Sequence, residues 1–193
     1  MDKYDIIIDA EQQFAREVTL GVIYLRPLSA WHYLIPGMFI IDFLRRGSII
    51  RKYTETFMFP RKLALRAARS LSEEQTRGTI DSYLAGEIKN WLIAHKLDSQ
   101  DLEITQKETV VLLMDHYARL LQAEGQSYYD LIQNAYSSRE NFEAHLRQIT
   151  AAENNVDQAI LARVGDNPAV KEKLQVEAQQ VENRRRKILD DIF

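Results

Sequence analysis

The sequence predicts an all-α fold, on three observations. Apolar residues recur at the three- and four-residue spacings of amphipathic helices along most of the 193 residues. The chain has seven Gly and four Pro, too few for the turns of an all-β protein. No segment alternates apolar and polar residues between turn signals, as strands do. We therefore expect a multi-helix bundle, with an N-terminal apolar segment broken by proline and a C-terminal antiparallel, coiled-coil-like helical hairpin.

The first two helices are expected over residues 4–25 and after Ser48. One apolar face of the first consists of Ile7, Phe14, Val18, Val22 and Leu25. Pro27 prevents its smooth continuation. The second continues through Ile49, Tyr53 and Phe57, and Pro60 is expected to kink or restart it before Leu63, Ala67 and Leu71.

Sequence patterns of the capping-box type mark the helix starts in the middle of the chain. The pattern begins at Ser72, Thr105 and Ser137, each followed three residues later by Gln or Glu. Between them lie a polar loop at about 97–104 and a short helix near 128–136. A clear apolar stripe precedes the loop and consists of Ile80, Tyr83, Leu84, Ile88, Trp91 and Leu92.

The last quarter of the chain predicts a helical hairpin. Two apolar stripes, 142–164 and 170–192, flank the turn Gly165-Asp166-Asn167-Pro168. Paired outward from the turn, the stripes match through seven layers, as in coiled-coil-like packing. Glu153 and Arg185 interrupt neighbouring layers, so we expect them to meet and to fix the register of the hairpin. The alternative is that both side chains reach solvent beside the seam.

Charge and patterning divide the chain into three regions: 1–70, a helical core at 71–136 and the hairpin at 137–193. The N-terminal region contains an apolar wedge (27–44) and a basic stretch (45–69). Residues 1–70 carry eleven basic and seven acidic side chains, a balance of +4, whereas 71–193 carry fourteen and twenty-one, a balance of −7. The overall charge of −3 is a cancellation of these two values.

The apolar wedge is the feature that suggests where the protein works. Its central Pro36-Gly37 favours two half-helices that enter and leave a membrane on one side. The basic residues after it would attract an anionic cytoplasmic leaflet. The expected membrane or partner contacts are Trp31, Tyr33, Leu34, Ile35, Met38, Phe39, Ile40, Phe43, Arg45, Arg46, Arg51, Lys52, Arg61 and Lys62. The competing interpretation is a helix buried in the protein core, because an all-apolar helix suits the centre of a bundle equally.

Motifs for catalysis and cofactor binding are missing from the sequence. Without cysteine there is no disulfide, zinc-ribbon or thiol chemistry. The four histidines, His32, His95, His116 and His145, lie in separate elements without metal-binding spacing, and we expect each at the surface. No glycine-rich phosphate loop occurs. We expect no catalytic residue, metal or cofactor, and nucleic-acid binding is disfavoured because the acidic remainder of the chain opposes it.

Two runs resemble stretches of an uncharacterised bacterial family of small helical proteins. They are Ser29-Ala30-Trp31-His32-Tyr33-Leu34-Ile35-Pro36 and Leu120-Leu121-Gln122-Ala123-Glu124-Gly125-Gln126-Ser127. The similarity extends through much of the chain. The resemblance implies a small helical protein and no particular activity.

Three functions follow from this sequence as hypotheses. The first is a non-catalytic scaffold or interaction protein in the cytoplasm, peripheral or monotopic on the inner membrane face or attached to a membrane-bound complex. Its acidic helices would bind a protein partner. The second is a soluble interaction module that buries 28–44 in its core or in a homo-oligomer interface. The third is a helical enzyme, which a deep cavity joining two histidines to Asp or Glu would favour.

Overall fold

The structure is a computed structural model that describes residues 2–24, 38–73, 75–165 and 167–193; for residues 24 and 38–46 it describes the backbone. In these ranges it contains seven helices and no strand. The predicted all-α fold is confirmed. The helices are α1 (Lys3–Tyr24), α2 (Met38–Ser72), α3 (Arg77–Ala94), α4 (Gln100–Gln122), α5 (Tyr128–Tyr136), α6 (Arg139–Val164) and α7 (Pro168–Ile192).

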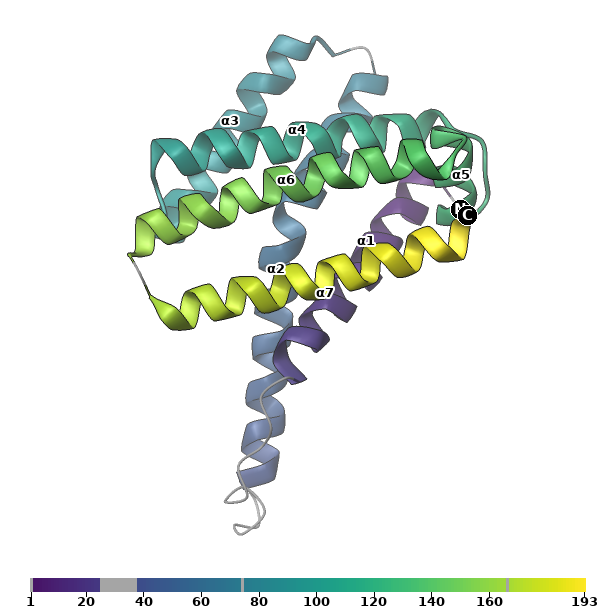
Figure 1. Cartoon of the computed structure of the whole chain (residues 1–193). Coiled ribbons are helices and arrows are strands. Elements are labelled where there is room, and N and C mark those ends of the chain that lie inside the picture. Colours follow the sequence, from purple (N-terminus) through teal and green to yellow (C-terminus); the bar gives the residue numbers. More distant parts are fainter. Residues whose placement is uncertain (1, 25–37, 74, 166) are drawn as a thin grey trace.

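The long helices α4 and α6 lie side by side, and α2 crosses them (Figure 1). Helix α1 packs against α2 and α7, and α3 packs against α2 and α4. One apolar core joins all three regions distinguished in the sequence, with Ile7, Leu65, Met114 and Ile149 among its buried members. The predicted stripes of α1 and α3 face this core, since Ile7, Phe14, Val18, Ile80, Leu84, Ile88 and Leu92 are buried.

The first half of α2 extends beyond the rest of the bundle (Figure 1). The helix is continuous over 35 residues, so the expected start at Ser48 is wrong, and Pro60 does not restart the helix. Proline has no N–H and cannot donate to the carbonyl four residues earlier, at Thr56. Packing of Met58, Leu63, Ala64 and Leu65 in the core offsets that loss and keeps the helix running.

Helix starts depend on capping residues other than those expected. Ser99 Oγ accepts the Leu102 N–H at 3.1 Å and begins α4 before Thr105. Ser72 ends α2, and Thr76 precedes α3. Ser138, one residue after Ser137, caps α6. The Ser72 and Thr105 patterns are therefore wrong, because their hydroxyls donate to carbonyls within a helix instead, those of Arg69 and Asp101.

The short helix α5 and the hairpin helices α6 and α7 have the predicted positions. Ser127 and Asp130 form a complete capping box at the start of α5. Pro168 begins α7, where its missing N–H costs nothing, and Asn167 caps the helix. Helices α6 and α7 run antiparallel, so the hairpin topology is confirmed (Figure 1).

Candidate functional site

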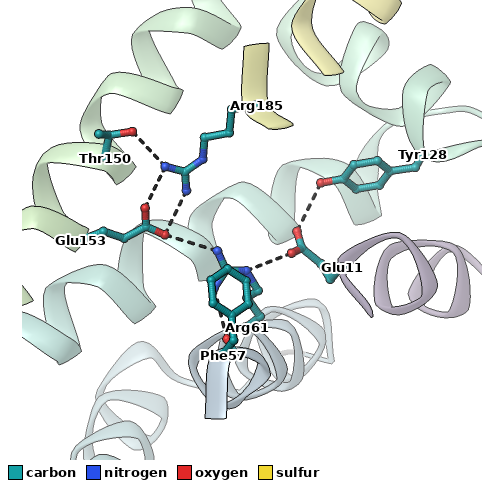
Figure 2. A network of polar contacts seen from close by, with 7 residues as sticks. All are labelled: Glu11, Phe57, Arg61, Tyr128, Thr150, Glu153 and Arg185. Atoms are coloured by element: carbon teal, nitrogen blue, oxygen red, sulfur yellow. Dashed lines mark hydrogen bonds and ion pairs between the residues drawn. The ribbon is translucent and has the colours of Figure 1, made fainter. Parts of the chain in front are cut away.

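A network of buried charges ties five helices together at the centre of the bundle (Figure 2). Arg61 of α2 donates from Nε to Glu11 of α1 at 3.1 Å and from Nη2 to Glu153 of α6 at 3.3 Å. Glu153 also accepts two hydrogen bonds from Arg185 of α7, at 2.7 and 2.9 Å. Tyr128 of α5 donates to Glu11 at 3.3 Å. Two carboxylates and two guanidinium groups balance each other's charge.

Glu153 and Arg185 meet across the hairpin, as the sequence predicts. Thr150 accepts a further hydrogen bond from Arg185 at 2.9 Å. Burial acts to raise the pKa of the Glu153 carboxyl, but Arg185 and Arg61 outweigh it and hold that pKa below its ordinary value. The carboxylate is therefore ionised at neutral pH. Its role in fixing the hairpin register stays a prediction.

Arg61 corrects the expectation that it belongs to a basic surface. Its side chain is 5% exposed. Its Nη1 donates to the Phe57 carbonyl at 3.2 Å, and its guanidinium lies 3.9 Å from the centre of the Phe57 ring. Burial acts to lower the pKa of Arg61, but Glu11 and Glu153 raise it overall. Arg61 is thus a permanent charge inside the bundle and has no free surface to offer a membrane.

The other expected contact residues lie on α2 or outside the described residues. Arg51 and Lys52 are exposed, and Lys62 is half-buried. Met38, Phe39, Ile40, Phe43, Arg45 and Arg46 belong to the first part of α2, where the structure describes the backbone. Trp31, Tyr33, Leu34, Ile35 and the Pro36-Gly37 break fall outside the described residues. Within the described part of the chain, none of the helices has the length and apolarity to cross a bilayer.

A cavity of about 330 Å³, the central cavity, adjoins the network. Its apolar wall includes Phe14, Leu113, Phe142 and Ile149, and its polar wall includes Glu11, Arg61, His116, His145, Arg184 and Arg185. The cavity reaches solvent beside Gln13 of α1 and Tyr129 of α5, which also line it and are exposed. Its volume is within the range of small-molecule pockets in proteins. It joins two histidines to a glutamate, the arrangement that favours the enzyme hypothesis.

The two cavity histidines are buried, so the expectation of surface positions is wrong for both. His116 is 5% exposed and His145 is 9% exposed. Their rings stack with centres 4.8 Å apart, and His116 Nδ1 is 2.7 Å from the Tyr136 hydroxyl. His145 Nε2 is buried and has no hydrogen-bond partner among the described residues.

Both histidines are uncharged at neutral pH. Burial, helped by Arg119 and Arg185, lowers the pKa of His145 to about 4. Burial, the neighbouring His145 and the same two arginines lower the pKa of His116. A base of such low pKa is a weak proton acceptor at pH 7, so the geometry supports hydrogen bonding to a ligand better than acid–base catalysis. No group of three or more His, Asp or Glu side chains in the described ranges is placed to hold a metal ion.

A second space, the α6–α7 groove, has a volume of about 560 Å³. Val156, Ile160, Val170 and Leu174, four members of the predicted hairpin seam, line it together with Tyr53 and Phe57 of α2. Farther from the turn, Phe142, Ile149 and Ile188 are buried and line the central cavity. The sequence predicts close packing of the two hairpin helices through seven layers. This is wrong near the turn, where α6 and α7 border the groove together with α2.

Two carboxyl groups, those of Asp157 and Glu177, line the α6–α7 groove. Tyr53 donates a hydrogen bond to Glu177. Burial and the charges of Glu177 and Glu153 raise the pKa of Asp157 to about 7. Burial raises the pKa of Glu177, although Tyr53 and Arg61 act in the opposite direction. Ionised Asp157 therefore destabilises the fold, and protonation relieves that cost.

Replacing Asp157 with Asn is expected to stabilise the protein at pH 8. The shift in pKa corresponds to about 4 kcal/mol, and partial exposure of the carboxyl reduces the expected gain to about 2 kcal/mol. At about pH 5 the gain should be smaller, because Asp157 is then protonated in the folded protein while the unfolded chain is still mostly ionised; it disappears only below the ordinary pKa of Asp, about 3.8. Urea unfolding at both pH values measures it, with Glu172→Gln at an exposed site of α7 as the control. A gain of equal size at both pH values would contradict the shifted pKa.

Comparison of the chain with protein-family models, curated proteins and solved structures found no match. The resemblance to an uncharacterised bacterial family therefore stays a prediction.

Proposed function

We propose that this protein is a non-catalytic helical scaffold that attaches to an anionic membrane surface through the projecting half of α2. The observation that carries this proposal is the extension of α2 beyond the bundle (Figure 1). The projecting half begins with the apolar run Met38-Phe39-Ile40-Ile41. An apolar run at the end of a helix that extends beyond its bundle favours insertion into a bilayer interface.

Charge on the same half of α2 supports an anionic surface. Arg45 and Arg46 follow the apolar run in the sequence, and Arg51 and Lys52 are exposed one to two turns later. Each basic side chain near an anionic leaflet contributes about 1 kcal/mol. Exposed Ile49, 49% accessible, adds apolar surface beside them. The acidic bundle would face away from the lipid and present its helices to a protein partner, on the cytoplasmic side of the membrane.

Liposome flotation at low salt tests the attachment. The wild-type protein should float with vesicles of phosphatidylcholine and phosphatidylserine, and Phe39→Asp with Ile40→Asp should abolish flotation. Two carboxylates at the apolar end cost about 2 kcal/mol or more, over tenfold in the partition constant. The matched control places the same charges on exposed apolar residues of the bundle, as Ile93→Asp with Ile104→Asp, and should float like wild type.

Two outcomes would refute membrane attachment through the projecting half of α2. The first is a wild-type protein that stays unbound to anionic vesicles at low salt. The second is equal loss of flotation in the control pair, which would place binding elsewhere on the bundle. In the first case the soluble interaction module is the better description. Arg51→Gln with Lys52→Gln should weaken binding to anionic vesicles about thirtyfold and leave binding to neutral vesicles unaffected.

A further inference from the structure

The central cavity has an excess of cationic side chains in its wall. Its lining contains three arginines, Arg61, Arg184 and Arg185, and one carboxylate, that of Glu11. Glu153, which pairs with Arg61 and Arg185, is not part of the lining. Arg184 Nε is 2.9 Å from Glu17, whose carboxylate is partly exposed at the surface and is also outside the lining. Inside the cavity the nearest charges are therefore mainly positive.

Two residues of the same wall have N–H donors without a partner among the described residues. Arg185 uses three of its five N–H groups in hydrogen bonds to Thr150 and Glu153, the contacts found among the described residues. His145 Nε2 is buried without a partner. An unsatisfied buried polar group costs about 1–3 kcal/mol, and a bound acceptor would remove that cost. An uncharged imidazole can donate from Nε2 when the other nitrogen carries no proton.

The remaining wall is aromatic and apolar. Phe14, Phe142, Tyr128 and the stacked His116–His145 pair contribute rings from four helices, α1, α4, α5 and α6. Rings of this kind bind flat apolar surfaces by stacking and edge contacts. The cavity thus combines a slot for a planar group with cationic and neutral donors at one side.

We propose that the central cavity binds a small planar organic anion, an aromatic carboxylate, with its ring among Phe14, Phe142 and the histidine pair. Its carboxylate accepts hydrogen bonds from Arg185 and His145. The positive charge of Arg184, which also lines the cavity, attracts the same carboxylate. A carboxylate matches guanidinium donors in geometry and charge, whereas a cation of the same shape would face three arginines. Membrane attachment and this site involve separate residues, so the proposal goes beyond the proposed function.

Titration calorimetry with 2-naphthoate as the probe tests the site. One molecule should bind per chain, and 2-naphthamide and 2-naphthylmethylamine, the neutral and cationic probes of similar shape, should bind at least tenfold more weakly. His145→Phe keeps the ring and removes Nε2, so it should lower the affinity for 2-naphthoate about tenfold. His95→Phe, the same change at an exposed site, should leave the affinity within twofold of wild type.

A measurement on the wild-type protein keeps the test independent of how the variants fold. In nitrogen-15 spectra of the histidine rings, 2-naphthoate should shift the His145 signals and leave those of His95 in place. The Phe39→Asp, Ile40→Asp protein should bind the probe normally, which separates this site from membrane attachment. Absence of binding at millimolar probe, equal binding of the three probes, or wild-type affinity in His145→Phe would each overturn the proposal.

Discussion

Replacing Arg61 with Met is expected to lower the free energy of unfolding by about 3–5 kcal/mol. Met has a similar length and fills much of the space, but it leaves Glu11 as a carboxylate that is 10% exposed and has no cationic partner in the network. Removing one member of a buried ion pair costs that much because the other charge stays desolvated. Chemical denaturation at pH 7 measures the loss.

Two further variants separate lost charge from lost packing. Arg66→Met, at an exposed site of the same helix, should change stability by about 0.5 kcal/mol or less. Adding Glu11→Gln to Arg61→Met should recover part of the loss, since the unpaired charge is gone. If Arg61→Met costs under about 1 kcal/mol, or the second substitution deepens the loss, the network does not act through its charges.

The second large effect is expected from acid. His145 has a pKa of about 4 in the folded protein, against an ordinary value of about 6.5 in the unfolded chain. Between these values the unfolded state binds more protons, so stability falls as the pH falls. From pH 7 to pH 4 this one side chain should remove about 3 kcal/mol of stability, at about 1.4 kcal/mol per unit of pKa.

A difference between two proteins isolates this contribution. Asp157 has the opposite tendency, because its raised pKa makes the fold more stable as it protonates. Wild type and His145→Phe share Asp157, so its effect cancels when their unfolding free energies are subtracted at each pH. The wild type should lose about 3 kcal/mol relative to the variant between pH 7 and pH 4. Parallel stability curves would show that His145 is already accessible to protons in the folded protein.

The sequence contains a signal for every member of the charge network. Glu153 and Arg185 were predicted to meet because they interrupt apolar stripes. Glu11 interrupts a stripe in the same way, since it occupies the seven-residue gap between Ile7 and Phe14. Arg61 lies four residues after Phe57 on the inner face of α2. A charged residue at a core position of a helix was thus the signal for all four members.

Other features depend on packing between distant segments and leave no local pattern. The burial of His116 and His145 follows from the approach of α4, α5 and α6, because their neighbours in the sequence are ordinary helix residues. The α6–α7 groove exists because α2 lies beneath the hairpin near its turn, which the matching of the two stripes could not anticipate. Capping patterns were misleading where Ser or Thr found a helical carbonyl instead of a helix start.

Arg61 and Arg185 line both the central cavity and the α6–α7 groove. These two guanidinium groups therefore form part of the wall between the two spaces. Each has a fixed number of N–H donors, which ligands in both spaces would compete for. A molecule on one side that takes hydrogen bonds from this pair withdraws them from the other side. We therefore expect filling of either space to alter the free energy of filling the other, and by thermodynamic reciprocity that influence has the same size in both directions.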